Sequence, residues 1–170
     1  TRNMSSAASD VYKRQDLGGA LSPFNAFLIL QGLETISLRM KTHCENASKV
    51  AHFLENHKSV DHVIYPELQT GISKENAVKY LNKGFGGLVG FELKGGAEAG
   101  KKFIDNLKLF YHVANIGDSR SLAIHPATTT HSQLSSEDKL KSGVSDSYVR
   151  LSVGIEPVSY THLTLPTTCS

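Results

Sequence analysis

The segment 148–155 narrows the choice of fold more than any other part of this sequence, because its side chains alternate in character. The apolar positions are Val149, Leu151, Val153 and Ile155, and the polar or small positions between them are Arg150, Ser152 and Gly154. A period of two residues is typical of a β-strand that buries one face and leaves the other in a polar environment. The pattern therefore predicts a half-buried strand on which Arg150 points away from the core.

Arg150 also follows a part of the sequence that is rich in polar side chains, including the threonine run 128–130 and His131. An arginine on a strand, among small and apolar residues, can hold a carboxylate through two parallel charge-assisted hydrogen bonds. The segment from Asp118 to Glu156 thus indicates a site for a small anionic substrate. The residues alone leave a second interpretation open, in which Arg150 pairs with an acid on the surface.

The rest of the pattern predicts an α+β domain. Ser22 followed by Pro23 is typical of a helix N-cap and first turn, and the apolar run after them predicts a largely buried helix. From Met40 the apolar positions become one-sided, so the helix is expected to continue toward solvent and to end near 56–58. The other expected elements are strands at 60–65, 88–93, 109–116, 121–125 and 148–155, and helices at 74–81 and 97–107. The expected fold is a small, mainly antiparallel sheet covered by helices, with one long helix entering from the N-terminal side.

The amino-acid composition limits the kinds of partner that this protein is expected to bind. The 170 residues are 39% hydrophobic and contain no apolar run of membrane-spanning length, which indicates one globular domain and no membrane partner. The 18 basic and 16 acidic residues leave a net charge of +2 without a basic block, so nucleic acid is not expected. Cys44 and Cys169 show no paired spacing, which argues against a disulfide framework and a structural zinc site and fits a cytoplasmic location.

The two ends of the chain differ from its middle. Residues 1–15 are polar and aperiodic, and residues 158–170 follow a strand without the pattern of a final helix. Both are interpreted as non-native or disordered flanks and are excluded from the fold. The predicted domain is therefore 16–157, truncated at both ends.

Other sequence signatures predict no further site. The glycines at 84, 86, 87, 90, 95 and 96 match neither the dinucleotide fingerprint nor a P-loop, and are interpreted as turn and packing residues. His125 and His131 are the nearest candidates for a metal site but lack an acid or cysteine at ligand spacing, and His125 is expected to make a structural hydrogen bond at a strand end. A Ser-His-Asp arrangement stays open, although no G-x-S-x-G elbow occurs.

Ordered motifs along the chain resemble the γ-family of pyridoxal-phosphate enzymes of cysteine and methionine metabolism. The motifs are LSPFNAF at 21–27 with QGLET at 31–35 and LRM at 38–40, KGFGG at 83–87, ANIGD at 114–118, HPATTTH at 125–131 and RLSVGIE at 150–156. The resemblance covers essentially all of 16–157. Within the family the chain is most similar to the O-acetylhomoserine sulfhydrylase branch, because Asn115 stands where the related lyases usually carry serine.

The resemblance implies a fold and a set of site residues. The fold is the C-terminal small domain of a fold-type I PLP-dependent transferase. Arg150 is expected to bind the α-carboxylate of an amino-acid substrate, with Asn115 contributing hydrogen bonding beside it and the Thr130 hydroxyl lining the same pocket. In the family the Schiff-base lysine, the phosphate cup and the aspartate at the pyridinium nitrogen belong to a preceding domain. This chain is therefore expected to hold no catalytic, cofactor-binding or metal-binding residue, and to be inactive alone.

For the intact enzyme the resemblance implies a homo-oligomer that uses pyridoxal 5'-phosphate and makes homocysteine or methionine from O-acetylhomoserine and sulfide or a thiol. Two alternatives stay open. One is a sister reaction of the same family, that of a cystathionine γ-synthase or a γ-lyase. The other is a stand-alone binding domain without catalysis.

Overall fold

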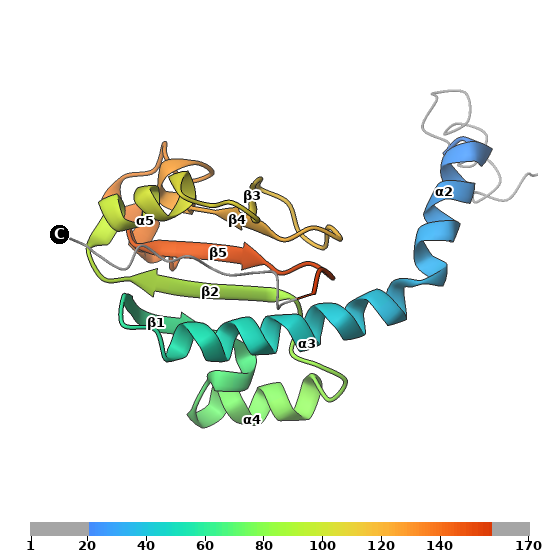
Figure 1. Cartoon of the computed structure of the whole chain (residues 1–170), viewed down its shortest axis with the longest axis horizontal. Helices are drawn as coiled ribbons and strands as arrows, with labels where there is room; N and C mark the ends of the chain where they lie inside the picture. The colour runs from blue at the N-terminus through green and yellow to red at the C-terminus, as the bar shows by residue number, and fades with distance from the viewer. Residues whose placement is uncertain (1–20, 158–170) are drawn as a thin grey trace, which may run out of the picture. The chain divides into compact units, whose positions relative to one another are not determined.

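The computed structural model describes residues 21–157, so both predicted flanks lie outside the described residues. These residues divide into two units between Ser37 and Leu38, and each unit is considered by itself. In chain order the elements are α2 (Pro23–Glu34), α3 (Ile36–Glu55), β1 (Val60–Ile64), η1 (Pro66–Leu68), α4 (Gly71–Tyr80), β2 (Leu88–Leu93), α5 (Gly96–Asp105), β3 (Tyr111–His112), β4 (Leu122–Ile124), η2 (Pro126–Thr128), α6 (Ser136–Lys141) and β5 (Tyr148–Ser152) (Figure 1). None of the helices described is both long and apolar enough to cross a membrane.

Helix α2 begins as the sequence predicts. The Ser22 side chain accepts a hydrogen bond from the Asn25 amide at 3.2 Å, and Pro23 occupies the first turn. The helix ends at Glu34, one turn residue follows, and α3 begins at Ile36, so the single long helix that was expected is divided in two. Gly32 and Thr35 are both weak helix formers, which accounts for an interruption at this point.

The expectation that α2 is largely buried is wrong for the described chain. The helix has no buried residue, and Phe24 is 68% exposed and Leu28 is 52% exposed. Apolar side chains on every side of a helix indicate cover in the setting where the sequence functions. The prediction failed because an apolar pattern shows that a helix needs cover but not which residues provide it. The described residues do not cover α2.

The second unit contains a five-stranded sheet with the order β1-β2-β5-β4-β3. Every neighbouring pair is antiparallel except β3 and β4, which are parallel, so the predicted mainly antiparallel sheet is confirmed. Strand β3 covers only two residues of the expected 109–116. The chain leaves the sheet afterwards and turns at Gly117, whose φ of +76° lies in the left-handed region that favours glycine.

Helices α3 and α5 pack against one face of this sheet. Ala47, Val50, Ala51 and Leu54 of α3 and Ala99, Phe103 and Ile104 of α5 share one hydrophobic cluster with the inward side chains of β1, β2 and β5. The rings of Phe91 and Phe103 meet edge to face with centroids 5.4 Å apart. Figure 1 shows α3 running along the strands, and α4 beyond the β1 side of the sheet. Burial of this one face accounts for the alternating pattern along β2 and β5.

The opposite face of the sheet carries Arg150. The β-ladder places Arg150 between Gly90 of β2 and Ile124 of β4, whereas Leu151 is paired with Val89 and Ala123 on the core side. This confirms the prediction that Arg150 points away from the core. Helix α6, which was not predicted, has the polar sequence SEDKLK and lacks the apolar period that would have indicated a helix.

Candidate functional site

Arg150 lies in a space that its neighbours leave open. Opposite it is Gly90, and the ring of Tyr148 covers that glycine so closely that a β-carbon there would lie 2.6 Å from the tyrosine hydroxyl. Tyr148 and Arg150 are two residues apart on one strand and therefore point to the same face. A glycine at position 90 thus leaves room for the tyrosine ring on the face of the sheet that carries Arg150.

The hydrogen bonds of Arg150 are incomplete. Its Nη2 donates to the main-chain oxygen of Asn115 at 3.3 Å, while its Nε is buried and has no hydrogen-bond partner among the described residues. No ion pair joins Arg150 to an acid within residues 21–157, so the interpretation as a surface ion pair finds no support there. A buried donor without a partner costs about 1–3 kcal/mol, and such a group calls for an explanation in terms of function.

Tyr148 is a neutral neighbour of this arginine at physiological pH. Burial raises the pKa of the Tyr148 hydroxyl above its ordinary value, and Glu92 adds to this, while the positive charge of Arg150 acts in the opposite direction. The wall beside Arg150 is therefore an uncharged aromatic ring. It does not compete with a substrate anion for the guanidinium.

The structure brings together two of the three predicted substrate-binding residues. Asn115 meets Arg150 through its main-chain oxygen, and its side-chain Oδ1 accepts from the Ile116 amide at 2.9 Å. Thr130 is exposed, and its hydroxyl pairs with His131 Nδ1 at 2.9 Å. No described contact joins Thr130 to Arg150 or to Asn115. The roles of all three toward a substrate remain predictions.

His125 has the structural role that the sequence suggested. It is fully buried, its Nε2 lies 2.9 Å from the main-chain oxygen of Asp146, and its Nδ1 lies 2.9 Å from the Thr128 hydroxyl. Because a carbonyl oxygen only accepts, Nε2 is the protonated nitrogen. Both ring nitrogens thus have partners. Among the described residues, no group of three or more His, Cys, Asp or Glu side chains is placed to hold a metal ion.

A small cavity of about 80 Å³ lies beside the end of β5. Its lining is mostly apolar and includes Met40, Leu88, Ile116 and Val153, together with Ser152, which follows Arg150 on the same strand face. Ligand pockets usually occupy roughly 300–1,000 Å³. This recess is too small to hold a whole amino acid.

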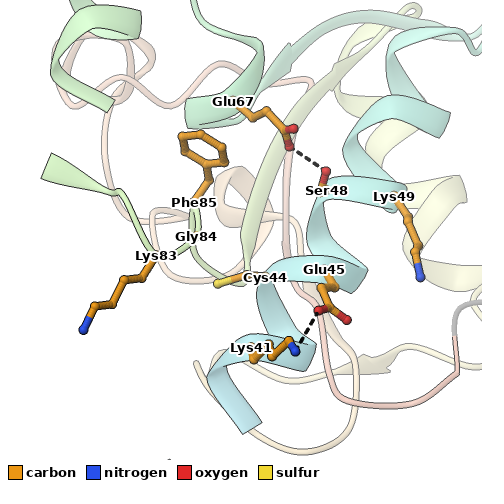
Figure 2. Close-up of a pocket in the computed structure, with 9 residues that line it drawn as sticks. All are labelled: Lys41, Cys44, Glu45, Ser48, Lys49, Glu67, Lys83, Gly84 and Phe85. Atoms are coloured by element: carbon orange, nitrogen blue, oxygen red, sulfur yellow. Dashed lines mark hydrogen bonds and ion pairs between the residues drawn. The ribbon is translucent and has the colours of Figure 1, made fainter. Parts of the chain in front are cut away.

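A larger cleft of about 500 Å³ lies on α3, against η1 and the turn at 83–85 (Figure 2). Four of its polar residues form two pairs: the Ser48 hydroxyl donates to Glu67 Oε2 at 2.5 Å, and Lys41 lies 4.0 Å from Glu45. The free Cys44 packs against Gly84, where a β-carbon would lie 2.7 Å from its sulfur. The cleft is larger than the recess at β5, but none of the described residues that line it has a buried side-chain nitrogen or oxygen without a hydrogen-bond partner.

The polar residues that hold the turn after β5 were missed as functional candidates. The Asn46 side chain of α3 donates to the main-chain oxygens of Gly154 and Glu156, and the Glu156 carboxylate accepts from the Ser121 amide. Asn46 and His43 are the two buried polar side chains on a helix face that is otherwise apolar, and polar residues at such positions were the sequence signal that could have indicated these contacts.

The described residues do not fit an attachment site for pyridoxal phosphate. A Schiff-base lysine must be held in a protected position, where burial lowers the pKa of its amine. No lysine among residues 21–157 is buried. The described part of the chain therefore contains an incompletely paired arginine but no lysine of this kind.

Comparison with known proteins identifies the family of this chain. The sequence matches the family of Cys/Met metabolism PLP-dependent enzymes over residues 2–160. It is similar to the O-acetyl-L-homoserine sulfhydrylase of Leptospira meyeri, with 55% identity over 145 residues that cover 85% of this chain and 33% of that protein. The chain spans about a third of the length of the curated relatives it matches.

Two solved structures are similar in fold as well as in sequence. One is described as an O-acetylhomoserine (thiol)-lyase of Campylobacter jejuni and carries a pyridoxyl-lysine phosphate; it is 46% identical with a TM-score of 0.78, over 85% of this chain and 34% of that one. The other is the cystathionine gamma synthase of Xanthomonas oryzae pv. oryzae in complex with aminoacrylate and cysteine, 39% identical with a TM-score of 0.76, over 88% of this chain and 38% of that one. Fold, sequence and the predicted dependence on pyridoxal phosphate agree, and the chain belongs to the Cys/Met metabolism family of PLP-dependent enzymes.

Proposed function

We propose that residues 16–157 form the carboxylate-binding side of an O-acetylhomoserine sulfhydrylase. The complete enzyme makes homocysteine or methionine from O-acetylhomoserine and sulfide or a thiol. This chain alone is inactive, because the Schiff-base lysine lies in the part of the enzyme that precedes it. The complete enzyme is a homo-oligomer, which size-exclusion chromatography with light scattering would test.

One observation carries this proposal, which is the incomplete pairing of Arg150. Its Nη2 donates to the Asn115 carbonyl, its Nε is buried without a partner, and no ion pair joins it to an acid within residues 21–157. A carboxylate would supply the missing charge and hydrogen bonds, and arginine holds carboxylates bidentately. Every amino acid carries such a group, which suits a family that acts on amino acids.

The other residues of the site position the substrate. The buried position of Arg150 Nε and the neighbouring Tyr148 ring reduce the access of water to the guanidinium, which strengthens its attraction for an anion. Pyridoxal phosphate supplies the electron sink for the bond changes when it is bound. Arg150 binds one end of the substrate and thereby orients its reacting carbons.

The second candidate is the cystathionine γ-synthase reaction. The similarity to the Xanthomonas oryzae enzyme favours it, and both reactions require the same carboxylate site. Asn115, in the position where related lyases usually carry serine, favours the sulfhydrylase. The two candidates differ in the sulfur nucleophile, which is sulfide or a thiol in one and cysteine in the other.

A chimera tests the proposal. Residues 16–157 would replace the equivalent third of the Leptospira meyeri enzyme, and visible absorption of the bound cofactor would confirm that the chimera has folded. We expect homocysteine from O-acetylhomoserine and sulfide, and little cystathionine when cysteine is the donor. Preferential formation of cystathionine would favour the second candidate. A folded, cofactor-loaded chimera that makes neither product would refute both.

A further inference from the structure

The loop that contacts Arg150 depends on other parts of the domain to hold its conformation. Residues 113–121, here called the clamp loop, join β3 to β4 and supply the Asn115 carbonyl that receives Arg150 Nη2. Most of the clamp loop is exposed, and its internal hydrogen bonds are short-range, such as that from the Arg120 amide to Asp118 Oδ1 at 2.9 Å. A loop of this kind opens easily unless other elements hold it. The position of its carbonyl must therefore depend on contacts from elsewhere.

Those contacts come from the end of β5 and the turn that follows it. The Gly117 amide donates to Ser152 Oγ at 3.1 Å, and the Ser121 amide donates to Glu156 Oε2 at 2.9 Å. In the reverse direction, the Gly154 amide donates to Ser121 Oγ at 3.0 Å. Each bond joins residues at least 33 positions apart in the sequence. The clamp loop is thus attached to the strand that carries Arg150.

The attachment is close-packed as well as hydrogen-bonded. The Ile155 amide donates to the Ser119 oxygen at 2.9 Å, and a β-carbon at Gly154 would lie 2.6 Å from the carbonyl carbon of Arg120. Only glycine allows two backbones to approach this closely. A small shift of the turn would therefore move the clamp loop.

Helix α3 fixes the other side of the same turn. The Nδ1 of His43 lies 2.6 Å from the Val153 oxygen, and Asn46 Nδ2 donates to the oxygens of Gly154 and Glu156 at 3.0 and 2.8 Å. Both side chains are buried. The turn is therefore held between helix α3 and the clamp loop. Glu156 is the residue of this turn whose charged side chain contacts the loop.

We propose that Glu156 is a positioning residue for the substrate carboxylate. Its carboxylate holds the Ser121 amide, which keeps the clamp loop in place, and the clamp loop holds Arg150 through the Asn115 carbonyl. A charged acceptor is suited to this task, because charge-assisted hydrogen bonds are roughly twice as strong as neutral ones. This inference rests on the proposed function, since it assigns to Glu156 the orientation of the arginine that binds substrate.

The test uses the chimera with three substitutions. Glu156→Ala should raise the KM for O-acetylhomoserine about tenfold with kcat within about twofold, because an interaction that orients bound substrate is lost. Glu156→Gln keeps an oxygen that can accept from the Ser121 amide and should recover most of the effect. The matched control is Glu92→Ala. Glu92 Oε1 also accepts one hydrogen bond, from Ser145 Oγ at 2.7 Å, but toward the other end of β5, and its loss should leave KM unchanged.

Hydrogen exchange in the same chimeras provides a readout that does not depend on activity. Glu156→Ala should speed exchange of the Ser121 and Gly117 amides about tenfold or more and leave the Val89 amide of β2 unchanged. Faster exchange without a change in KM would overturn the inference, and so would equal effects of Glu156→Ala and Glu92→Ala on KM. If Arg150→Ala raises KM and Glu156→Ala does not, this inference fails while the proposed function stands. If neither variant raises KM, both fail.

Discussion

Arg150 lies on β5, and His125 directly follows the neighbouring strand β4. These two polar side chains differ in how completely their hydrogen bonds are satisfied. His125 is completely buried, and both of its ring nitrogens have partners within the domain. Arg150 is half-buried, holds one carbonyl oxygen, and has a buried Nε without a partner among the described residues. The difference shows that unmet hydrogen-bonding capacity is a better guide to function than burial or residue type. Satisfied groups stabilise the fold, whereas unsatisfied ones are available to a ligand.

Replacing Arg150 should have the largest effect, and on binding rather than stability. In the chimera, Arg150→Ala should weaken amino-acid binding by about 2–5 kcal/mol, because a partly buried charged partner of the substrate is lost. KM for O-acetylhomoserine would measure this, and the urea midpoint should change little. Arg120→Ala is the matched control, because Arg120 is exposed and pairs with Asp118 in the same loop. Unchanged affinity in Arg150→Ala would refute the carboxylate assignment.

His125 should show the reverse behaviour. His125→Ala leaves the Asp146 carbonyl without its donor and opens a void in the domain, so we expect the free energy of unfolding of this chain to fall by about 3 kcal/mol. Urea denaturation would measure the loss. His62→Ala, on the exposed side of β1, should change it by less than about 0.5 kcal/mol. Equal effects from the two histidines would contradict a structural role for His125.

Tyr65 extends the comparison to a third buried polar group. Its hydroxyl donates to the Gly86 oxygen at 3.1 Å, and burial, together with Cys44 and Glu67, raises its pKa above the ordinary value. Above about pH 10 the unfolded chain loses this proton while the folded chain keeps it, so stability should fall as the pH rises. Tyr65→Phe should cost about 1 kcal/mol at neutral pH and make the fall above pH 10 shallower.

Urea denaturation at about pH 8 and about pH 11 would compare the two slopes. Tyr148 also has a raised pKa and should leave part of the slope in place. The control is Tyr80→Phe, since Tyr80 is 68% exposed. If Tyr65→Phe leaves the fall in stability between these pH values unchanged, the Tyr65 hydroxyl is not the group whose raised pKa causes the fall.

Asn115 and Thr130 should give the smallest effects. The contact from Asn115 to Arg150 uses the main-chain oxygen, which Asn115→Ala retains, and Thr130 has no described contact with Arg150. Each alanine variant should therefore raise KM in the chimera by less than about threefold, which is under 1 kcal/mol. A larger rise in KM for either variant would mean that its side chain contacts the substrate directly. The substrate would then be bound by hydrogen bonds from residues other than Arg150 as well.

The sheet and the direction of Arg150 were predictable, because a strand that is buried on one face must alternate in character. The Ser22 cap and the general course of α3, α4 and α5 followed from equally local rules. The exposure of α2 did not, since its apolar residues show that the helix needs cover but not what provides it. The short β3 and the clamp loop were unpredictable for another reason. Residues such as Glu156 and Ser121 fix that loop across 35 positions of sequence, and no local pattern encodes such a contact.

The packing of His125 also limits how this sequence can change over time. Gly100 of α5 lies directly under the imidazole, and a β-carbon at that position would collide with the ring atoms. Neither position can accept a larger residue while the other stays as it is, since the ring is fixed by hydrogen bonds and the helix by its burial against the sheet. The two sites should therefore covary among relatives, with a small residue at position 100 wherever an imidazole occupies position 125. A lineage that lost the histidine would be free to acquire a side chain on the helix.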